Sequence, residues 1–513
     1  MRIGFGRALQ SALALVVLAS AGVGSLASAG TANRVTVMPR APVHGSRVPE
    51  HRVKRNAGAG PIYYAGGGTV PSIAFVGTTQ AAAGQSNPAV VPGPGTSGSI
   101  FDYFVLTYSP NRGADTISYC EGSAGFGKAV MDGANENDQV SQPTPLPANA
   151  NLTCASPVGQ KQVLQTNGFS AVGQDFGDFA GIDQLSANDF NTWVNNAQSS
   201  GHSISGRGLP VQVPYIIASI ALFYDNSDPA VESQQLKLTS TQLCKIADGE
   251  ITNWNQLNSN FASKTLSFAV RSDSAGASFG LSNHLNAVCK GAGETYGVSN
   301  NYDEYIPGNP SIGALPNPLP QGATTQFFLS ASGNAGVVST VESHDGSIGY
   351  VEAASALAGV NGSNLNFALV NGKNPVTNLP ASAGLVKASA LLKSSAFGSD
   401  VANARAPIVT LSPTDNCLLL ENPMTYANPA KGYPIILVVS LIFSQAGNGT
   451  DAADLQALAY MVSQKRPEAV GPGKITTIDV YGRSQIGQTG YSTLNQGTFG
   501  KIVKSTATSC IGQ

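Results

Sequence analysis

Two short segments of this sequence carry residue types that could bind an anion or attack an ester. The first, GSAGFGKA at residues 122–129, departs from the phosphate-cradling G-x-x-x-x-G-K-[ST] loop only at its last position, which is Ala129. Without a Ser or Thr hydroxyl there is no ligand for Mg²⁺, which argues against a nucleoside triphosphatase. A Gly/Ser-rich turn that opens a helix still binds anions, because backbone N–H groups and the helix dipole face the ligand.

The second segment, GASFG at residues 276–280, matches the G-x-S-x-G nucleophile elbow of serine hydrolases. Ser278 would be the nucleophile, and Asp303 and His344 follow it in the hydrolase order. An elbow requires a strand that runs directly into the serine, whereas the strand predicted here ends near Arg271. A helix N-terminus built from small residues is the favoured interpretation, and a serine esterase stays open as the alternative.

The elements that must position these segments alternate between strand and helix patterns. Short runs of β-branched and aromatic residues predict strands at residues 101–108, 211–224, 266–271 and 433–443, the last of them fully buried. Helical patterns occur at residues 186–198, 240–249 and 450–465, the last with Thr450 as its capping residue. Such alternation predicts an α/β fold with helices on both faces of the sheet, and the length allows two lobes.

The composition restricts the classes of function. Only 11% of the 513 residues are charged, and the formal net charge is -2, so the chain has no general attraction for nucleic acid. A hydrophobic content of 42% excludes a disordered protein, while 58 Gly and 30 Pro indicate many turns and long loops. Any anion site must therefore be local.

The N-terminal residues are typical of an exported protein. Arg2 and Arg7 precede a short apolar stretch at residues 12–24, and Ala27-Ser28-Ala29 is a small-x-small cleavage signal. We therefore predict a signal peptide at residues 1–29 and a flexible basic linker at residues 30–60. The apolar stretch is too short for a membrane span, so the mature protein is expected in the periplasm or outside the cell.

The six cysteines are consistent with export. They are even in number and widely separated, which predicts three disulfides in an oxidising compartment. Six cysteines allow 15 pairings, and we favour sequential pairs because these close the shortest loops. The expected pairs are Cys120–Cys154, Cys244–Cys289 and Cys417–Cys510. No metal-ligand spacing occurs, so neither a metal nor a cofactor is expected.

Six segments, taken in order, give a more specific signal than any one of them alone. They are AGGGTVP from Ala65, SYCEGSAGFGK from Ser118, DFAGIDQLS from Asp178, GEITNWNQL from Gly249, AVRSDSAGASF from Ala269 and GSIGYVEAASA from Gly346. This series resembles the phosphate-binding proteins of bacterial high-affinity phosphate ABC transport, including their DING-type relatives. The resemblance covers roughly residues 62–445, and the DING tetrapeptide itself is absent.

The resemblance implies an α/β, two-lobed periplasmic-binding-protein fold of type II, with a hinge and a central anion cleft. The first lobe would take residues 61–208, the second residues 209–365, and residues 366–513 would return to the first lobe with insertions.

The resemblance also implies the residues that contact the anion. On the first lobe these are Thr69, Val70 through its backbone N–H, Ser123 at a helix start, and Asp183. On the second lobe they are Arg271, with Asp273 to orient it, and the backbone N–H groups of Gly276, Ala277 and Ser278. Two family hydroxyls are missing, because Ala275 and Ala277 stand where the family has Ser and Thr. Ser274 and Ser278 flank these positions and are the candidates to compensate.

These residue types suit a tetrahedral oxyanion, which accepts hydrogen bonds on every side. A carboxylate such as Asp183 accepts a hydrogen bond from protonated phosphate, but repels fully ionised sulfate. The alternatives are a helix cap for Asp183 and a surface ion pair with Asp273 for Arg271.

Two classes of function follow. The favoured one is a monomeric, exported solute-binding protein, not an enzyme, that captures phosphate or a related oxyanion for an ABC permease. The alternative is an exported hydrolase, either a phosphatase built on the same cleft or an esterase that uses Ser278. A decayed site with a surface role is a third possibility.

Overall fold

The computed structural model describes residues 62–76, 100–104, 116–132, 177–202, 204–289, 298–299, 327–358, 366–379, 386, 417–463, 490–494 and 497–512. All of these residues belong to one compact unit, Gly45–Gln513. The predicted signal peptide and linker lie outside the described residues. None of the helices in the described ranges is long and apolar enough to cross a membrane.

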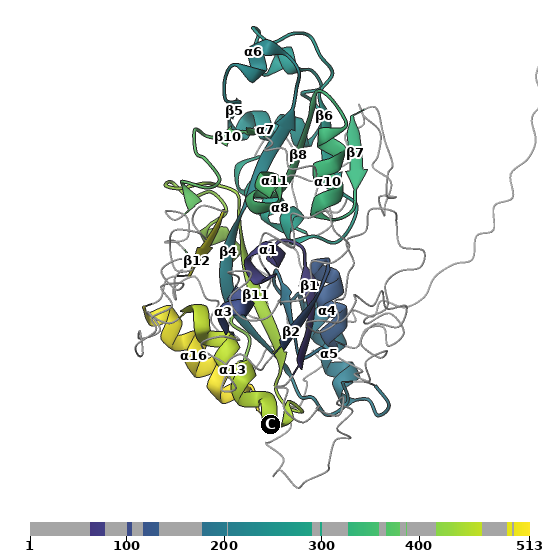
Figure 1. The fold of residues 1–513 in the computed structure, drawn as a ribbon, viewed down its shortest axis with the longest axis vertical. Helices are drawn as coiled ribbons and strands as arrows, with labels where there is room; N and C mark the ends of the chain where they lie inside the picture. Colours follow the sequence, from purple (N-terminus) through teal and green to yellow (C-terminus); the bar gives the residue numbers. More distant parts are fainter. Residues whose placement is uncertain are drawn as a thin grey trace, which may run out of the picture. The chain divides into compact units, whose positions relative to one another are not determined.

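One large mixed sheet organises the described residues (Figure 1). Its strands lie in the order β2 (Thr116–Gly122), β1 (Ile62–Gly68), β3 (Phe179–Ile182), β11 (Ile436–Ser444), β4 (Pro210–Asp225), β8 (Ser347–Glu352), β6 (Ser267–Arg271) and β7 (Phe328–Ala331). Two short strands, β12 (Tyr491–Thr493) and β9 (Asn366–Phe367), also pair with β4. A separate pair joins β5 (Lys237–Leu238) to β10 (Leu369–Val370).

The 16-residue strand β4 joins the two halves of this sheet. Its first part, Pro210–Ser219, pairs antiparallel with β11, and its second part, Ile220–Asp225, pairs antiparallel with β8. Every residue of β4 except Asp225 is buried, which explains its near-continuous run of β-branched and aromatic residues. We call the strands β2, β1, β3 and β11 with their helices the first half, and β8, β6 and β7 with theirs the second half.

Helices cover the sheet and connect its strands. The longer ones are α4 (Ala124–Asp132), α5 (Ala187–Gln198), α7 (Ser240–Ala247), α8 (Gly276–Val288), α10 (Gly333–Glu342), α13 (Ala452–Tyr460) and α16 (Thr498–Cys510). The shorter ones are α1 (Ser72–Val76), α3 (Ile100–Tyr103), α6 (Pro229–Glu232) and α11 (Ala353–Ala358), with 3-10 turns η3 (Trp254–Gln256), η6 (Pro423–Thr425), η7 (Gly449–Asp451) and η8 (Met461–Ser463).

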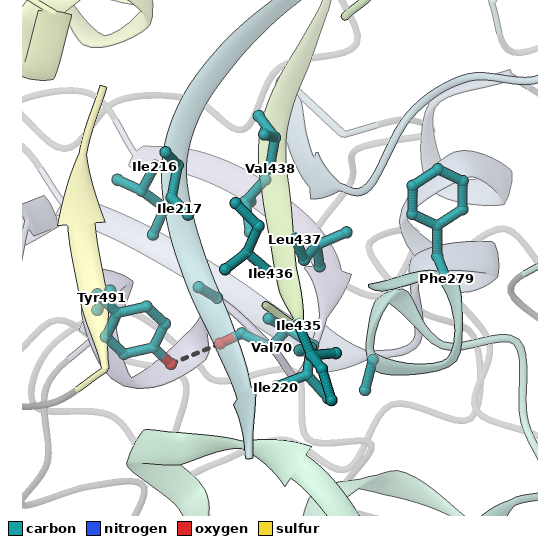
Figure 2. Packing of buried hydrophobic residues seen from close by; sticks show 14 of the residues in the cluster. Val70, Ile216, Ile217, Ile220, Phe279, Ile435, Ile436, Leu437, Val438 and Tyr491 are labelled. Atoms are coloured by element: carbon teal, nitrogen blue, oxygen red, sulfur yellow. Dashed lines mark hydrogen bonds between the residues drawn. The ribbon is translucent and has the colours of Figure 1, made fainter. Parts of the chain in front are cut away.

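The largest hydrophobic core extends through both halves of the sheet. Figure 2 shows apolar side chains of β4 and of residues 435–438 between Tyr491 on one side and Phe279 of α8 on the other. Tyr491 Oη donates a hydrogen bond to the Val70 carbonyl (2.5 Å), which ties the loop after β1 to β12. The loop that follows β1 is therefore anchored to the core through Val70.

Most of the elements expected from the sequence are confirmed. Strands occupy Pro210–Asp225, Ser267–Arg271 and Ile436–Ser444, and the last is buried throughout. Helix α5 begins after Ser186, whose side chain forms a capping box with Asp189.

Two local expectations were wrong. The segment expected to be a strand from Phe101 begins as helix α3, because Phe101 stacks on Phe75 of α1 (ring centroids 4.6 Å apart) and also contacts Tyr119 and Phe179. These contacts override the intrinsic strand preference of aromatic residues. Thr450 does not cap a helix by its side chain, since it lies inside η7 and α13 begins only at Ala452.

The two disulfides among the described residues confirm the sequential pairing. Cys244–Cys289 joins α7 to the end of α8, and Cys417–Cys510 joins the segment before η6 to α16. The third expected pair lies partly outside the described residues, at Cys154. By closing loops, these cross-links reduce the entropy of the unfolded chain.

Candidate anion-binding site

The residues predicted for the site follow the carboxyl ends of parallel strands in both halves of the sheet. Thr69, Ser123 and Asp183 follow β1, β2 and β3, which are mutually parallel around β1. Arg271 ends β6, which runs parallel to β7 and β8. In open α/β sheets, this edge is where ligands bind.

The structure brings the two halves together at this edge. The Gly276 α-carbon at the start of α8 is so close to the first half that a Cβ placed on it would lie 3.8 Å from Asp183 Cβ and 3.8 Å from Val70 Cγ2. In the same way, a Cβ placed on Gly125 would lie 3.2 Å from Ser274 Oγ and 3.7 Å from Ser123 Oγ. The first turn of α4 therefore faces the loop between β6 and α8.

The first half contributes a buried hydroxyl and a helix N-terminus. Thr69 is 3% exposed, and its Oγ1 makes no hydrogen bond to any residue that the structure describes. Ser123 caps α4, since its Oγ accepts a hydrogen bond from Phe126 N (3.0 Å). The hydroxyl hydrogen of Ser123 and the N–H groups of Ala124 and Gly125 in the first turn are left for an acceptor.

The second half contributes a buried and firmly held guanidinium. Arg271 Nε and Nη2 donate to the two oxygens of Asp273 at 2.7 and 2.5 Å, and Nη1 donates to Asn334 Oδ1 at 2.6 Å. Gly333 N also donates to Asp273 (3.1 Å). These contacts use three of the five N–H donors of Arg271 and leave two for a ligand.

The ionised forms of Arg271 and Asp273 are both favoured. Burial disfavours ionisation of both partners, but their mutual attraction outweighs it, so the pKa of Asp273 lies below and that of Arg271 above its usual range. The Arg271 side chain is 0% exposed, which rules out the alternative of a surface ion pair.

Asp183 is the least satisfied charged residue of the site. Its side chain is 0% exposed, and neither oxygen accepts a hydrogen bond from the described residues. Its partner is Lys128 of α4, whose Nζ lies 3.3 Å from Asp183 Oδ1 and 3.0 Å from Asp189 Oδ2. The alternative role of Asp183 as a helix cap does not hold, because Ser186 caps α5.

The start of α8 departs from the expected compensation. Ala275 is the N-cap and provides no side-chain hydrogen bond, while Ala277 is buried. Ser278 is also fully buried, and its Oγ forms a hydrogen bond with Tyr350 Oη (2.9 Å), so it does not replace a missing hydroxyl. Of the two flanking serines, Ser274 is the one that lies near Ser123 and Gly125.

The esterase constellation is not assembled in the described residues. His344 precedes β8 and bonds through Nδ1 with the Thr340 carbonyl (2.7 Å), at the end of the strands opposite to Arg271. Ser278 lies in α8, which follows the carboxyl end of β6, and its hydroxyl contacts Tyr350. Asp303 lies outside the described residues.

Sequence reasoning missed three residues around the site. Lys128 lies in the segment 122–129, for which the sequence already predicted anion binding, so its positive charge could have identified it as a site residue. Asn334 and Glu421 gave none, because they come from distant segments. Asn334 also contacts the buried Glu352. Burial raises the pKa of Glu421 to about 8, and the neighbouring charge of Asp183 adds to the shift.

Comparison with known proteins agrees with this architecture. Residues 121–465 match the family model of a PBP superfamily domain. The chain belongs to the PBP superfamily. The expected type II periplasmic-binding-protein fold is thereby confirmed, and solved structures support it. The ancestral soluble variant of the human phosphate binding protein matches with a TM-score of 0.52 at 18% identity. The match covers 86% of this chain and 93% of that protein's chain. The phosphate-binding protein of Stenotrophomonas maltophilia gives 0.51 with the same identity and coverage.

Curated relatives of this PBP superfamily member match over shorter stretches. The chain is 31% identical over 259 residues to alkaline phosphatase L of Pseudomonas aeruginosa, covering 49% of this chain and 58% of that protein. It is 29% identical over 196 residues to the phosphate-binding protein PstS of Xylella fastidiosa, covering 36% and 46%. The chain thus spans little more than half the length of the first of these relatives.

Proposed function

We propose that this protein is an exported solute-binding protein that captures inorganic phosphate, or a closely related oxyanion, between two lobes without converting it. The observation that carries the proposal is the buried Arg271, with two guanidinium N–H groups left over, at the same sheet edge as Thr69 and the N-terminus of α4. Hydroxyls, backbone N–H groups and one guanidinium are the donors that a desolvated tetrahedral anion requires.

Asp183 gives the proposed site its selectivity. A buried carboxylate with no hydrogen-bond donor among its described neighbours is suited to accept a proton-bearing oxygen of the ligand. Phosphate carries such a proton near neutral pH, whereas sulfate does not, so sulfate would leave two negative charges facing each other. The similarity to the phosphate-binding protein PstS of Xylella fastidiosa supports this choice of ligand.

The proposed lobes are residues 61–208 with 366–513 and residues 209–365, and β4 would serve as part of the hinge. In support, β4 is the strand that pairs with β11 of the first half and with β8 of the second. With the predicted signal at residues 1–29 removed and the linker at residues 30–60 retained, the proposed mature protein is a monomer in the periplasm or outside the cell. An ABC permease would receive the ligand.

Calorimetric titration tests the proposal. The mature protein, freed of ligand by reversible unfolding, is titrated with phosphate, sulfate and a phosphomonoester at neutral pH. We expect phosphate to bind tightly and sulfate to be rejected. No binding of phosphate at millimolar concentration would refute the proposal.

The same preparation tests the hydrolase alternative, which the similarity to alkaline phosphatase L of Pseudomonas aeruginosa supports. Hydrolysis of p-nitrophenyl phosphate is measured for the native protein and for Ser278→Ala. A binding protein releases no nitrophenol above background. Turnover that is lost in Ser278→Ala while phosphate binding persists would establish the hydrolase instead.

A further inference from the structure

We propose that Glu352, acting through Asn334, orients the guanidinium of Arg271 for the anion. This role rests on the proposed phosphate-binding function and deepens it. The group that contacts the anion is Arg271, so Asn334 and Glu352 are positioning residues.

The guanidinium of Arg271 is held from two sides. Asp273 accepts hydrogen bonds from Nε and Nη2 (2.7 and 2.5 Å), and Asn334 Oδ1 accepts one from Nη1 (2.6 Å). Nη1 and Nη2 therefore each keep one N–H that these contacts leave unused. The pair with Asp273 fixes one edge of the guanidinium and lets its plane tilt about that edge. The contact with Asn334 opposes this tilt, so the two remaining N–H groups keep a defined direction.

The orientation of the Asn334 amide is fixed by its other neighbours. Only its oxygen accepts a hydrogen bond, so the amide can serve Arg271 in just one of its two orientations. Asn334 Nδ2 donates to Glu352 Oε2 and lies 3.5 Å from Ser355 Oγ, which itself donates to Glu352 Oε1. Asn334 and Glu352 are buried, so water competes little for these contacts. The Glu352 carboxyl thus keeps Nδ2 on its own side and turns Oδ1 toward Arg271.

The backbone places both positioning residues beside the ion pair. Asn334 lies in the first turn of α10, next to Gly333, whose N–H donates to Asp273 (3.1 Å). The φ of Gly333 is +68°, a conformation that favours glycine. Glu352 ends β8, and β8 pairs directly with β6, the strand that ends at Arg271. The start of α10 therefore holds both partners of the ion pair, and the end of β8 fixes the start of α10.

Charge and orientation make opposite predictions for the removal of Glu352. An ionised carboxyl near the site opposes an anion, and a protonated one does not attract it, so its loss does not weaken binding through charge in either state. Loss of orientation does weaken binding, because the guanidinium must then be ordered when the anion binds. The other charged and titratable groups around the site stay unchanged; they are Asp273, Tyr350, Asp183 and Lys128.

Calorimetry with phosphate compares the native protein with Glu352→Leu and Glu352→Gln. Leucine removes the acceptor of Asn334 Nδ2, so we expect the dissociation constant to rise about tenfold or more, the equivalent of one charge-assisted hydrogen bond. Glutamine keeps an oxygen for Asn334 and an amide nitrogen for Ser355, so it should restore most of the affinity. An unchanged or lowered dissociation constant in Glu352→Leu would overturn the proposal.

A double-mutant cycle tests whether Glu352 acts through Asn334. Asn334→Leu should raise the phosphate dissociation constant at least as much as Glu352→Leu does. The double variant Asn334→Leu, Glu352→Leu should raise it no further than Asn334→Leu alone, because the second substitution acts on a contact that is already lost. Losses of binding free energy that add would show that Glu352 acts by another route, and would overturn the proposal.

Asn448 provides a matched control for lost stability. It is buried like Asn334, and its Oδ1 accepts a hydrogen bond from another buried arginine, at Arg207 Nη2 (3.2 Å). It follows the end of β11, at the edge of the sheet where β3 begins, opposite to the anion site. Asn448→Leu should lower the melting temperature but leave the phosphate dissociation constant unchanged. An equal loss of affinity in both asparagine variants would attribute the effect of Asn334 to general destabilisation.

Side-chain NMR of Arg271 separates this inference from the proposed function. In ligand-free native protein we expect separate signals for the two hydrogens on Nη1, because the contact with Asn334 hinders rotation of that group. The signals should merge in Asn334→Leu. If native protein does not bind phosphate, the proposed function fails, and these spectra still decide on the positioning. Merged signals in native protein would overturn it.

A folding defect in a single variant is also decisive. The double variant Asn334→Leu, Glu352→Leu removes both partners of a buried hydrogen bond, so it should fold even where one leucine alone does not, as followed by thermal melting. It should still bind phosphate more weakly than native protein. A folded double variant with native affinity would overturn the proposal. If it does not fold either, the Nη1 signals of native protein and Glu352→Gln decide, and merged signals in native protein again refute the role.

Discussion

The two buried ion pairs of this site are built in opposite ways. In the second half, both oxygens of Asp273 accept hydrogen bonds from Arg271, and Gly333 and Asn334 add further contacts. In the first half, Asp183 has one contact at 3.3 Å with Lys128 and no hydrogen bond from the described residues. In the proposed function, the guanidinium is thus fixed before the anion binds, whereas the carboxylate still lacks a donor.

Under the proposed function, this difference gives the two halves different tasks. A firmly oriented cation supplies affinity for any oxyanion, because its remaining donors need no reorganisation on binding. An unsatisfied carboxylate contributes little to affinity, but it penalises a ligand that has no proton to give. Affinity and selectivity would then respond to different substitutions.

Arg271→Met should have the largest effect. It removes two donors to the anion and leaves the Asp273 charge uncompensated, which costs about 3–5 kcal/mol of stability. The phosphate affinity should fall ~100-fold or more, since each charged hydrogen bond contributes roughly 1.5–3 kcal/mol. Calorimetry and thermal melting measure the two effects.

The double variant Arg271→Met, Asp273→Asn is the control for stability. It should recover much of the melting temperature, because no buried charge is left alone, but it should not recover phosphate binding. If binding returned together with stability, Arg271 would be a folding residue and not a ligand contact.

Asp183→Asn should change selectivity more than affinity. The asparagine keeps the shape but offers an amide donor in place of an acceptor, so phosphate affinity should fall about tenfold. Sulfate affinity should rise, because the repulsion is gone. Titrations with both anions on the same preparation provide the measurement. An unchanged ratio of the two affinities would remove the distinction between the two halves.

Glu421→Gln should act through pH. The folded pKa of about 8 exceeds the unfolded value of 4.5, so between these pH values the folded state holds a proton that the unfolded state has lost. Stability should therefore fall as the pH rises through this window, by up to about 1.4 kcal/mol per pH unit for one proton. Glu421→Gln should remove this slope in thermal melts between pH 5 and 8. A slope that persists in the variant would have to come from another group.

Ala275→Ser should have the smallest effect. Helix α8 has no side-chain cap at Ala275, and a serine there would accept a backbone N–H, which stabilises by about 1 kcal/mol. Its hydroxyl hydrogen would remain available to the anion, so phosphate affinity should rise a few fold, up to ~10-fold. A higher melting temperature with unchanged affinity would show that the hydroxyl serves only the helix.

Much of the fold could be predicted from local patterns. The long apolar run at 211–224 and the buried run at 433–443 form strands because β-branched residues fit a sheet buried on both faces. The sequence predicted that a helix starts at Ser186, but it did not predict the capping box that Ser186 forms there. The strand predicted from Phe101 was wrong. Phe101 lies in helix α3 and its ring packs on Phe75, a contact that sequence periodicity does not report.

The sequence by itself determined the pairing of Arg271 with Asp273. Arg271 ends strand β6 and Asp273 lies only two residues further along the chain, so the two side chains stay within reach of each other. It did not determine that Lys128 meets Asp183, or that Glu421 lies near them. These contacts arise because β1, β2 and β3 end at one edge of the sheet, where α4 and α5 begin, with β11 next to β3. Strand order is a property of the whole folded chain, so only the tertiary structure decided which charges share the site.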